Sequence, residues 1–77
     1  MEHIRNQNLL NEIVYLYNNK TGDRLDVQVL NETYIVQYLL RNGFYRKECS
    51  EQEVLEIVSN LNECRQDPEL FGLVSFE

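Results

Sequence analysis

The chain is poor in the residue types that build most recognisable sites. It has no alanine, one proline, one histidine, two cysteines and three glycines among its 77 residues. The glycines are isolated, so no glycine-rich phosphate loop is present. No apolar run approaches the roughly 18 residues that indicate a transmembrane helix. The N-terminus, MEHIRNQNLLNE, also lacks the cationic start and apolar block of a signal peptide. We therefore expect neither membrane insertion nor export.

Catalytic and metal-binding residues are equally scarce. His3 is the only histidine, and Cys49 and Cys64 are the only cysteines, whereas a structural metal site usually needs four ligands. Glutamates close to Cys49 in the sequence oppose formation of a thiolate nucleophile. We expect no enzyme, no cofactor and no metal. Both cysteines fit packing positions, which predicts reduced thiols in a cytoplasmic protein.

Length and composition predict a single small globular domain over residues 1–77, with residues 1–10 as a loosely ordered lead-in. The apolar fraction of 43% and the charged fraction of 26% are ordinary for a globular chain. Nine asparagines without any alanine fit an A/T-rich coding sequence. By association, this composition suggests the cytoplasm of a low-GC bacterium, with a phage or mobile element as the source.

Two segments predict a β-hairpin. Residues 10–18, LNEIVYLYN, are rich in β-branched and aromatic side chains and lead directly into a turn-forming stretch. Residues 24–29, RLDVQV, alternate polar and apolar side chains as a half-buried strand does. A helix through Leu10, Val14 and Tyr17 remains the alternative for the first segment, because these residues also recur at helical spacing.

A first helix is predicted from Glu32 to about Asn42. Asn31 can cap it, and its apolar residues cover most of the helix circumference. Gly43 suits the left-handed residue that ends a helix, with Phe44 folding back. We expect this helix to be the buried one.

A second helix has the clearest local signal. Ser50 and Glu53 form a capping box, and Cys49 and Val54 have the spacing of a hydrophobic staple around it. The apolar face then continues through Ile57, Val58, Leu61 and Cys64 until Asp67-Pro68 ends the helix.

Residues 70–76 predict a short last strand. The fold class is therefore α+β: a β-hairpin, two α-helices and a short C-terminal strand, with a three-stranded, mostly antiparallel sheet packed on two helices.

Charge is distributed unevenly along the chain. Residues 1–47 carry a net charge of +1 and residues 48–77 carry −7. The acids expected on the outer side of the second helix are Glu51, Glu53, Glu56 and Glu63. They form either a solvated helix face or a surface that docks on a basic protein partner.

Two further stretches bear on partners. Residues 41–47, RNGFYRK, interleave cations and aromatics as single-stranded nucleic-acid sites do, but the acidic half of the chain opposes direct nucleic-acid binding. Tyr15 and Tyr17 on the predicted first strand are candidates for a self-association surface, unless other residues cover that face.

Two functions follow from these patterns. The first is a small acidic, non-enzymatic interaction module that inhibits or regulates a larger partner, with a nucleic-acid-handling protein as one class. The second is a structural or assembly protein that pairs with its own copy, as a homodimer or a larger oligomer.

Overall fold

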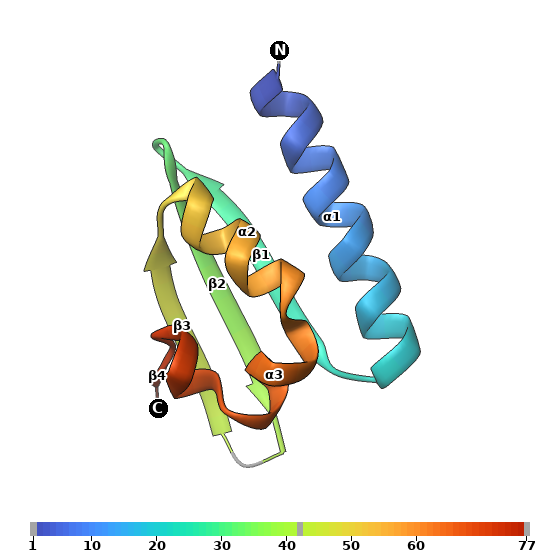
Figure 1. The fold of residues 1–77 in the computed structure, drawn as a ribbon, viewed down its shortest axis with the longest axis vertical. Coiled ribbons are helices and arrows are strands. Elements are labelled where there is room, and N and C mark those ends of the chain that lie inside the picture. Colours follow the sequence, from blue (N-terminus) through green and yellow to red (C-terminus); the bar gives the residue numbers. More distant parts are fainter. Residues whose placement is uncertain (1, 42, 77) are drawn as a thin grey trace.

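The computed structural model describes residues 2–41 and 43–76, with side chains from Gln7 onward. Its described strands form one antiparallel sheet in the order β1-β2-β3-β4, and the helices pack on one face of that sheet (Figure 1). The prediction of an α+β fold with a mostly antiparallel sheet and a short C-terminal strand is confirmed, but the described residues form four strands and three α-helices where the sequence predicts three strands and two helices. The elements are α1 (Glu2–Thr21), β1 (Arg24–Leu30), β2 (Thr33–Leu40), β3 (Gly43–Cys49), α2 (Glu51–Ser59), α3 (Leu61–Gln66), the 3-10 helix η1 (Pro68–Phe71) and β4 (Val74–Ser75).

Residues 10–18 belong to α1, so the predicted hairpin between them and residues 24–29 does not form. Leu10 and Val14, one helical turn apart, are both buried against the sheet. Burial of this helix side outweighs the strand propensity of the β-branched and aromatic residues around it. The helical alternative for this segment was the correct one, and α1 also includes residues 2–10, which the sequence predicts as a lead-in.

Asn18 and Gly22 shape the passage from α1 to β1. Gly22 has φ of 81° and donates its N–H to the Asn18 carbonyl at 2.8 Å, which ends the helix. The Asn18 side-chain amide accepts from the Leu25 N–H at 3.0 Å and donates to the Leu25 carbonyl at 2.9 Å. These two groups of Leu25 point away from β2, so the amide occupies the outer edge of β1.

Residues 33–40 form strand β2, whereas the sequence predicts a helix there. Asn31 and Glu32 have φ of 50° and 63°, the signature of a two-residue type I′ turn, so Asn31 reverses the chain instead of capping a helix. Gly43 starts β3 and does not end a helix; Asn42, the predicted helix end, lies outside the described residues.

The burial of β2 explains why it resembles a helix in sequence. It pairs with β1 on one side and β3 on the other along nearly its whole length. Side chains of a central strand have those of a neighbouring strand on each side, so even Ile35, on the open face, is buried. The apolar residues of β2 therefore also fill the circumference of a helical projection. The buried residues of β2 are Tyr34, Ile35, Val36 and Tyr38.

The capping box at Ser50 is confirmed. The Ser50 hydroxyl accepts from the Glu53 N–H at 3.3 Å, and the Glu53 carboxylate accepts from the Ser50 N–H at 2.9 Å. Cys49 and Val54 are buried on either side of this cap, as the staple predicts. The predicted single helix is nevertheless two, because Asn60, with φ of −130° and ψ of 43°, interrupts it between α2 and α3.

The last segment is shorter as a strand than predicted. Residues 68–71 form η1, Gly72 reverses the chain at φ of 86°, and only Val74 and Ser75 pair with β3 as β4. Leu73 is fully buried and anchors this segment in the hydrophobic core. The core lies between the sheet and the helices, and its members are Leu10, Val14, Leu25, Tyr34, Val36, Tyr38, Cys49, Val54, Ile57, Leu61, Cys64 and Leu73.

Candidate functional site

A group of hydrogen-bonded side chains, the tyrosine cluster, joins four parts of the fold: Tyr17 of α1, Asp23 of the following loop, Tyr38 of β2 and Arg65 of α3. The Tyr38 hydroxyl donates to the Asp23 carboxylate at 2.7 Å, and Arg65 Nε lies 3.0 Å from the same oxygen. The two hydroxyl oxygens are 2.6 Å apart. The Tyr38 hydroxyl has one proton and donates it to Asp23, so we assign Tyr17 as the donor in its hydrogen bond with Tyr38.

Burial makes the two phenols of this cluster weaker acids than an exposed tyrosine. It raises the pKa of Tyr38, and the hydrogen bonds with Tyr17 and Asp23 raise it further. Burial likewise raises the pKa of Tyr17. The cluster therefore holds its protons and fastens α1 and α3 to the sheet. Tyr17, a predicted partner-binding residue, is engaged inside the molecule.

Tyr15, the other predicted tyrosine, points away from the core. Successive residues of a helix are about 100° apart around its axis. Tyr15 and Tyr17 are two residues apart, so their side chains lie on nearly opposite sides of α1. Tyr15 is 65% exposed, and Leu9 and Leu16 of the same helix are also mostly exposed. The outer side of α1 is thus the place where the structure leaves a predicted aromatic contact accessible.

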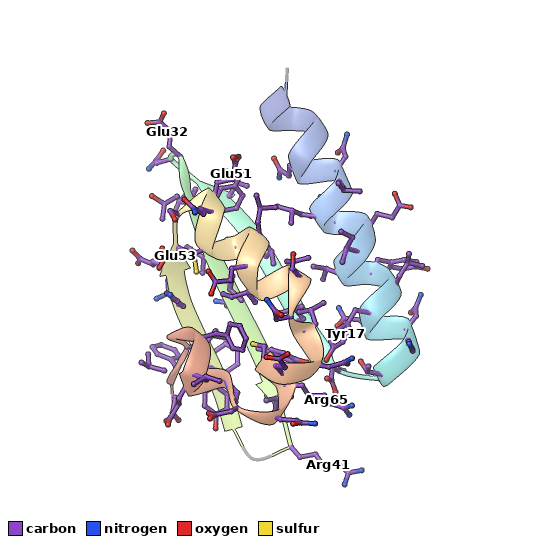
Figure 2. The ribbon with its side chains drawn as sticks, viewed as in Figure 1. Tyr17, Glu32, Arg41, Glu51, Glu53 and Arg65 are labelled. Carbon is purple, nitrogen blue, oxygen red and sulfur yellow. The ribbon has the colours of Figure 1, made fainter. Side chains whose placement is uncertain are left out.

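Glu51 and Glu53 lie at the start of α2 (Figure 2), and both are engaged within the fold. The Glu53 carboxylate completes the capping box and lies 2.9 Å from Lys47 Nζ. The backbone hydrogen bond from Ser50 and the ion pair with Lys47 lower the pKa of Glu53 to about 2. Glu51 faces Tyr34: burial raises the pKa of that phenol, and the Glu51 carboxylate raises it further.

Glu56 and Glu63 are the predicted acids that are exposed and not engaged by the cap or by Tyr34. Among the described residues, neither forms an ion pair. Because Asn60 interrupts the helix, Glu56 lies on α2 and Glu63 on α3 rather than along one continuous helix.

A groove of about 270 Å³ separates α2 from η1; we call it the acidic groove. Lys47 crosses it to reach Glu53, and its Nζ also donates to the Phe71 carbonyl at 3.1 Å. Lys47 Nζ lies 2.6 Å from where a Cβ would stand on Gly72, so a side chain at that position would displace the lysine from this arrangement, and the φ of 86° also favours glycine. The groove is lined by Lys47, Glu53, Glu56, Ile57, Leu70, Phe71 and Gly72.

The rim of the acidic groove carries accessible groups of two kinds. Leu70 is 71% exposed, and Glu56 is exposed on the α2 side. Because Lys47 already pairs with Glu53, Glu56 is the carboxylate of this groove without a cation. An apolar side chain and an unpaired carboxylate therefore border the same hollow.

The cysteines have packing roles, as predicted. Cys49 and Cys64 are free and buried. Burial raises the pKa of both thiols, that of Cys64 to about 11, which favours the unreactive protonated form. His3 lies outside the described side chains. Over the part of the chain that the structure describes, no three potential metal ligands gather, and no helix has the length and apolarity needed to cross a membrane.

Comparison with protein-family models, with curated proteins and with solved structures finds no match for this chain. Function therefore has to be argued from its own geometry. Of the residues that line the acidic groove, the sequence analysis named only Glu53 and Glu56 as partner-binding, and it missed Lys47 and Leu70 among the others. The alternation in β3 that turns Lys47 toward the helices is detectable once residues 43–49 are recognised as a strand. The position of Leu70 depends on Gly72 reversing the chain.

Proposed function

We propose that the protein is a small acidic, non-enzymatic interaction module that inhibits or regulates a larger protein with a basic surface. The observation that carries this proposal is the acidic groove, where exposed Leu70 and unpaired Glu56 border one hollow. A lysine or arginine side chain of a partner suits this arrangement. Its aliphatic stem can lie on Leu70 while its charge meets the Glu56 carboxylate.

The surrounding charge supports the same direction of approach. Residues 50–72, which contain α2, α3 and η1, carry six acids and one base. On the opposite, open face of the sheet, Arg24 and Arg46 balance Asp26 and Glu48 along β1 and β3. A basic partner is therefore attracted to the helix side, and this attraction weakens as salt increases. Proteins that bind nucleic acid carry such basic surfaces and are the class to test first. The cytoplasm of a bacterial or phage-infected cell is the proposed setting, from composition alone.

Charge reversal tests the proposal. Tagged protein is cross-linked in a low-GC bacterial lysate, the captured partner is identified by mass spectrometry, and its affinity is then measured with purified proteins. The variant Glu56→Lys/Glu63→Lys should lose the partner because both acids are exposed and unpaired on the helix side. The control Asp26→Lys/Glu48→Lys makes the same change in net charge on the open sheet face and should keep it.

Two results would contradict this proposal. If both double variants lose the partner equally, overall charge and not the acidic groove governs capture. If the Glu56→Lys/Glu63→Lys protein folds as the parent does and keeps its affinity, the helix side is not the docking surface.

A second candidate, self-association, rests on the outer side of α1. Leu9, Tyr15 and Leu16 are each more than half exposed there, and exposed apolar side chains on one helix side are typical of helix–helix contacts. Sedimentation of the parent and of Tyr15→Lys tests it. A parent oligomer that dissociates in this variant supports it, and a parent that is monomeric at high protein concentration rules it out.

A further inference from the structure

A second groove lies at the opposite end of the sheet from the β1–β2 turn, and we call it the arginine groove. It has a volume of about 500 Å³ and is formed where the α1–β1 loop, the start of β1, the end of β2 and α3 meet. Three arginines line it, together with Asp23 and Leu39. Figure 2 shows two of the three, Arg41 and Arg65, at this end of the molecule. The volume is within the range of small-molecule sites, about 300–1,000 Å³.

The arginines differ in what they contact. Arg65 is paired with Asp23 at 3.0 Å, and Asp23 also accepts from the Tyr38 hydroxyl. Arg24 and Arg41 form no ion pair with any residue that the structure describes. With three arginines and one aspartate, the groove lining has a net charge of +2, in a chain whose net charge is −6. A bound anion reduces the repulsion between these like charges, so the groove favours an anionic ligand.

Strand register brings Arg24 and Arg41 together. Arg24 pairs with Leu39, and Arg41 lies two residues further along the chain. Arg41 directly follows the last residue of β2, and in a regular sheet residues in this diagonal relation are about 7–8 Å apart at their Cα atoms. That spacing lets two guanidinium groups approach one oxyanion from adjacent sides. Leu39, which is 44% exposed, offers an apolar wall beside them.

We propose that the arginine groove binds the phosphate group of a small phosphorylated molecule. A phosphate monoester carries a charge of about −1.5 to −2 at neutral pH, which matches the two free arginines. Guanidinium groups hold phosphate oxygens through paired, charge-assisted hydrogen bonds. The non-phosphate part of the ligand packs on Leu39. This inference is independent of the acidic groove, because it uses neither its residues nor its partner.

The test is an NMR titration of ¹⁵N-labelled protein at constant ionic strength. The probes are inorganic phosphate, pyrophosphate, a nucleoside monophosphate and, as the carboxylate comparator, succinate. We expect saturable shifts confined to residues 22–25, 39–41 and 65 with the phosphate probes. If the ligand is free phosphate, the inorganic ion binds as well as the nucleotide; if it is a phosphoester, the nucleotide binds more tightly.

Variants of exposed arginines separate the site from general charge. Arg24→Gln/Arg41→Gln should bind phosphate about tenfold more weakly or worse, because it loses charge-assisted hydrogen bonds. The control is Arg46→Gln, compared with the single variant Arg24→Gln, because each removes one positive charge. Arg46 lies outside the groove, near Glu48 and over the Phe76 ring. Arg46→Gln should bind as the parent does.

Three results would overturn the proposal. The first is the absence of saturable shifts in a folded parent protein. The second is an equal loss of affinity in Arg24→Gln and Arg46→Gln, which would mean general attraction of anions. The third is binding of succinate as tightly as pyrophosphate, which would show that the groove does not recognise phosphate.

Discussion

Two polar clusters fasten the helices to the sheet, and they differ mainly in burial. The tyrosine cluster joins α1, β2 and α3 through hydroxyls of which Tyr38 is fully buried. The cap cluster, formed by Lys47, Ser50 and Glu53, joins β3 to α2 through a carboxylate at the surface. Water competes for the bonds of the second cluster and for the exposed Arg65 of the first, but less for the bond between buried Tyr38 and Asp23. Similar bond lengths therefore have unequal effects on stability.

The largest loss should follow from removing the shared acceptor of the tyrosine cluster. Asp23→Ala leaves the buried Tyr38 hydroxyl without its carboxylate partner and should lower the free energy of unfolding by about 2–3 kcal/mol. Asp26→Ala is the matched control, because Asp26 is exposed on β1 and, among the residues that the structure describes, accepts a side-chain hydrogen bond only from Gln28. The control should stay within about 0.5 kcal/mol of the parent. Urea denaturation followed by circular dichroism measures both, and equal losses would refute the contrast in burial.

A smaller loss is expected in the cap cluster. Ser50→Ala removes the acceptor for the Glu53 N–H and should lower the free energy of unfolding by about 1 kcal/mol. Ser59→Ala, at the exposed end of α2, changes the same chemical group away from the cap and should have little effect. A Ser50→Ala loss as large as that of Asp23→Ala would mean that exposure does not weaken the cap cluster.

The smallest effect concerns pH and is stated as a direction. The pKa of Glu53 is about 2 in the folded protein, below its ordinary value of 4.5. Its stabilising contribution is therefore complete above pH 4.5 and is lost as the pH falls toward 2. In denaturation curves, the difference between the parent and Glu53→Gln should shrink over that window. Lys47→Gln should remove only part of the dependence, because the Ser50 N–H still donates to the carboxylate. A difference that is constant with pH would contradict this assignment.

Local signals in the sequence were sufficient for two elements. The alternation of residues 24–29 predicts β1, and the Ser50–Glu53 pair predicts the start of α2, because both patterns depend on near neighbours in the chain. For β2 and α1 the sequence indicates burial but not its geometry. The apolar side chains of residues 33–40 fit a buried helix as well as a strand with a neighbour on each side. Whether strands lie on both sides of residues 33–40 depends on pairing with β1 and β3, which the local propensity of these residues does not reveal.

The candidate sites were less predictable than the elements. Glu56 was identified from the sequence as an exposed acid, but Leu70 joins it only after Gly72 reverses the chain. The arginines of the arginine groove come from β1, the turn residue after β2 and α3, and no spacing in the sequence relates them. A surface assembled from distant segments depends on the fold, so it could be recognised only once strand register was known.

Asn18 also limits how the sheet can grow. An exposed edge strand offers its unpaired backbone groups to other chains and is a common start of aggregation. β1 is such an edge, seven residues long, whereas the β4 edge has only two. Because the Asn18 amide is hydrogen-bonded to both the N–H and the carbonyl of Leu25, another strand cannot pair with that end of β1. A second chain is left with the outward groups of Val27 and Val29 alone, too short a template to nucleate a fibril readily.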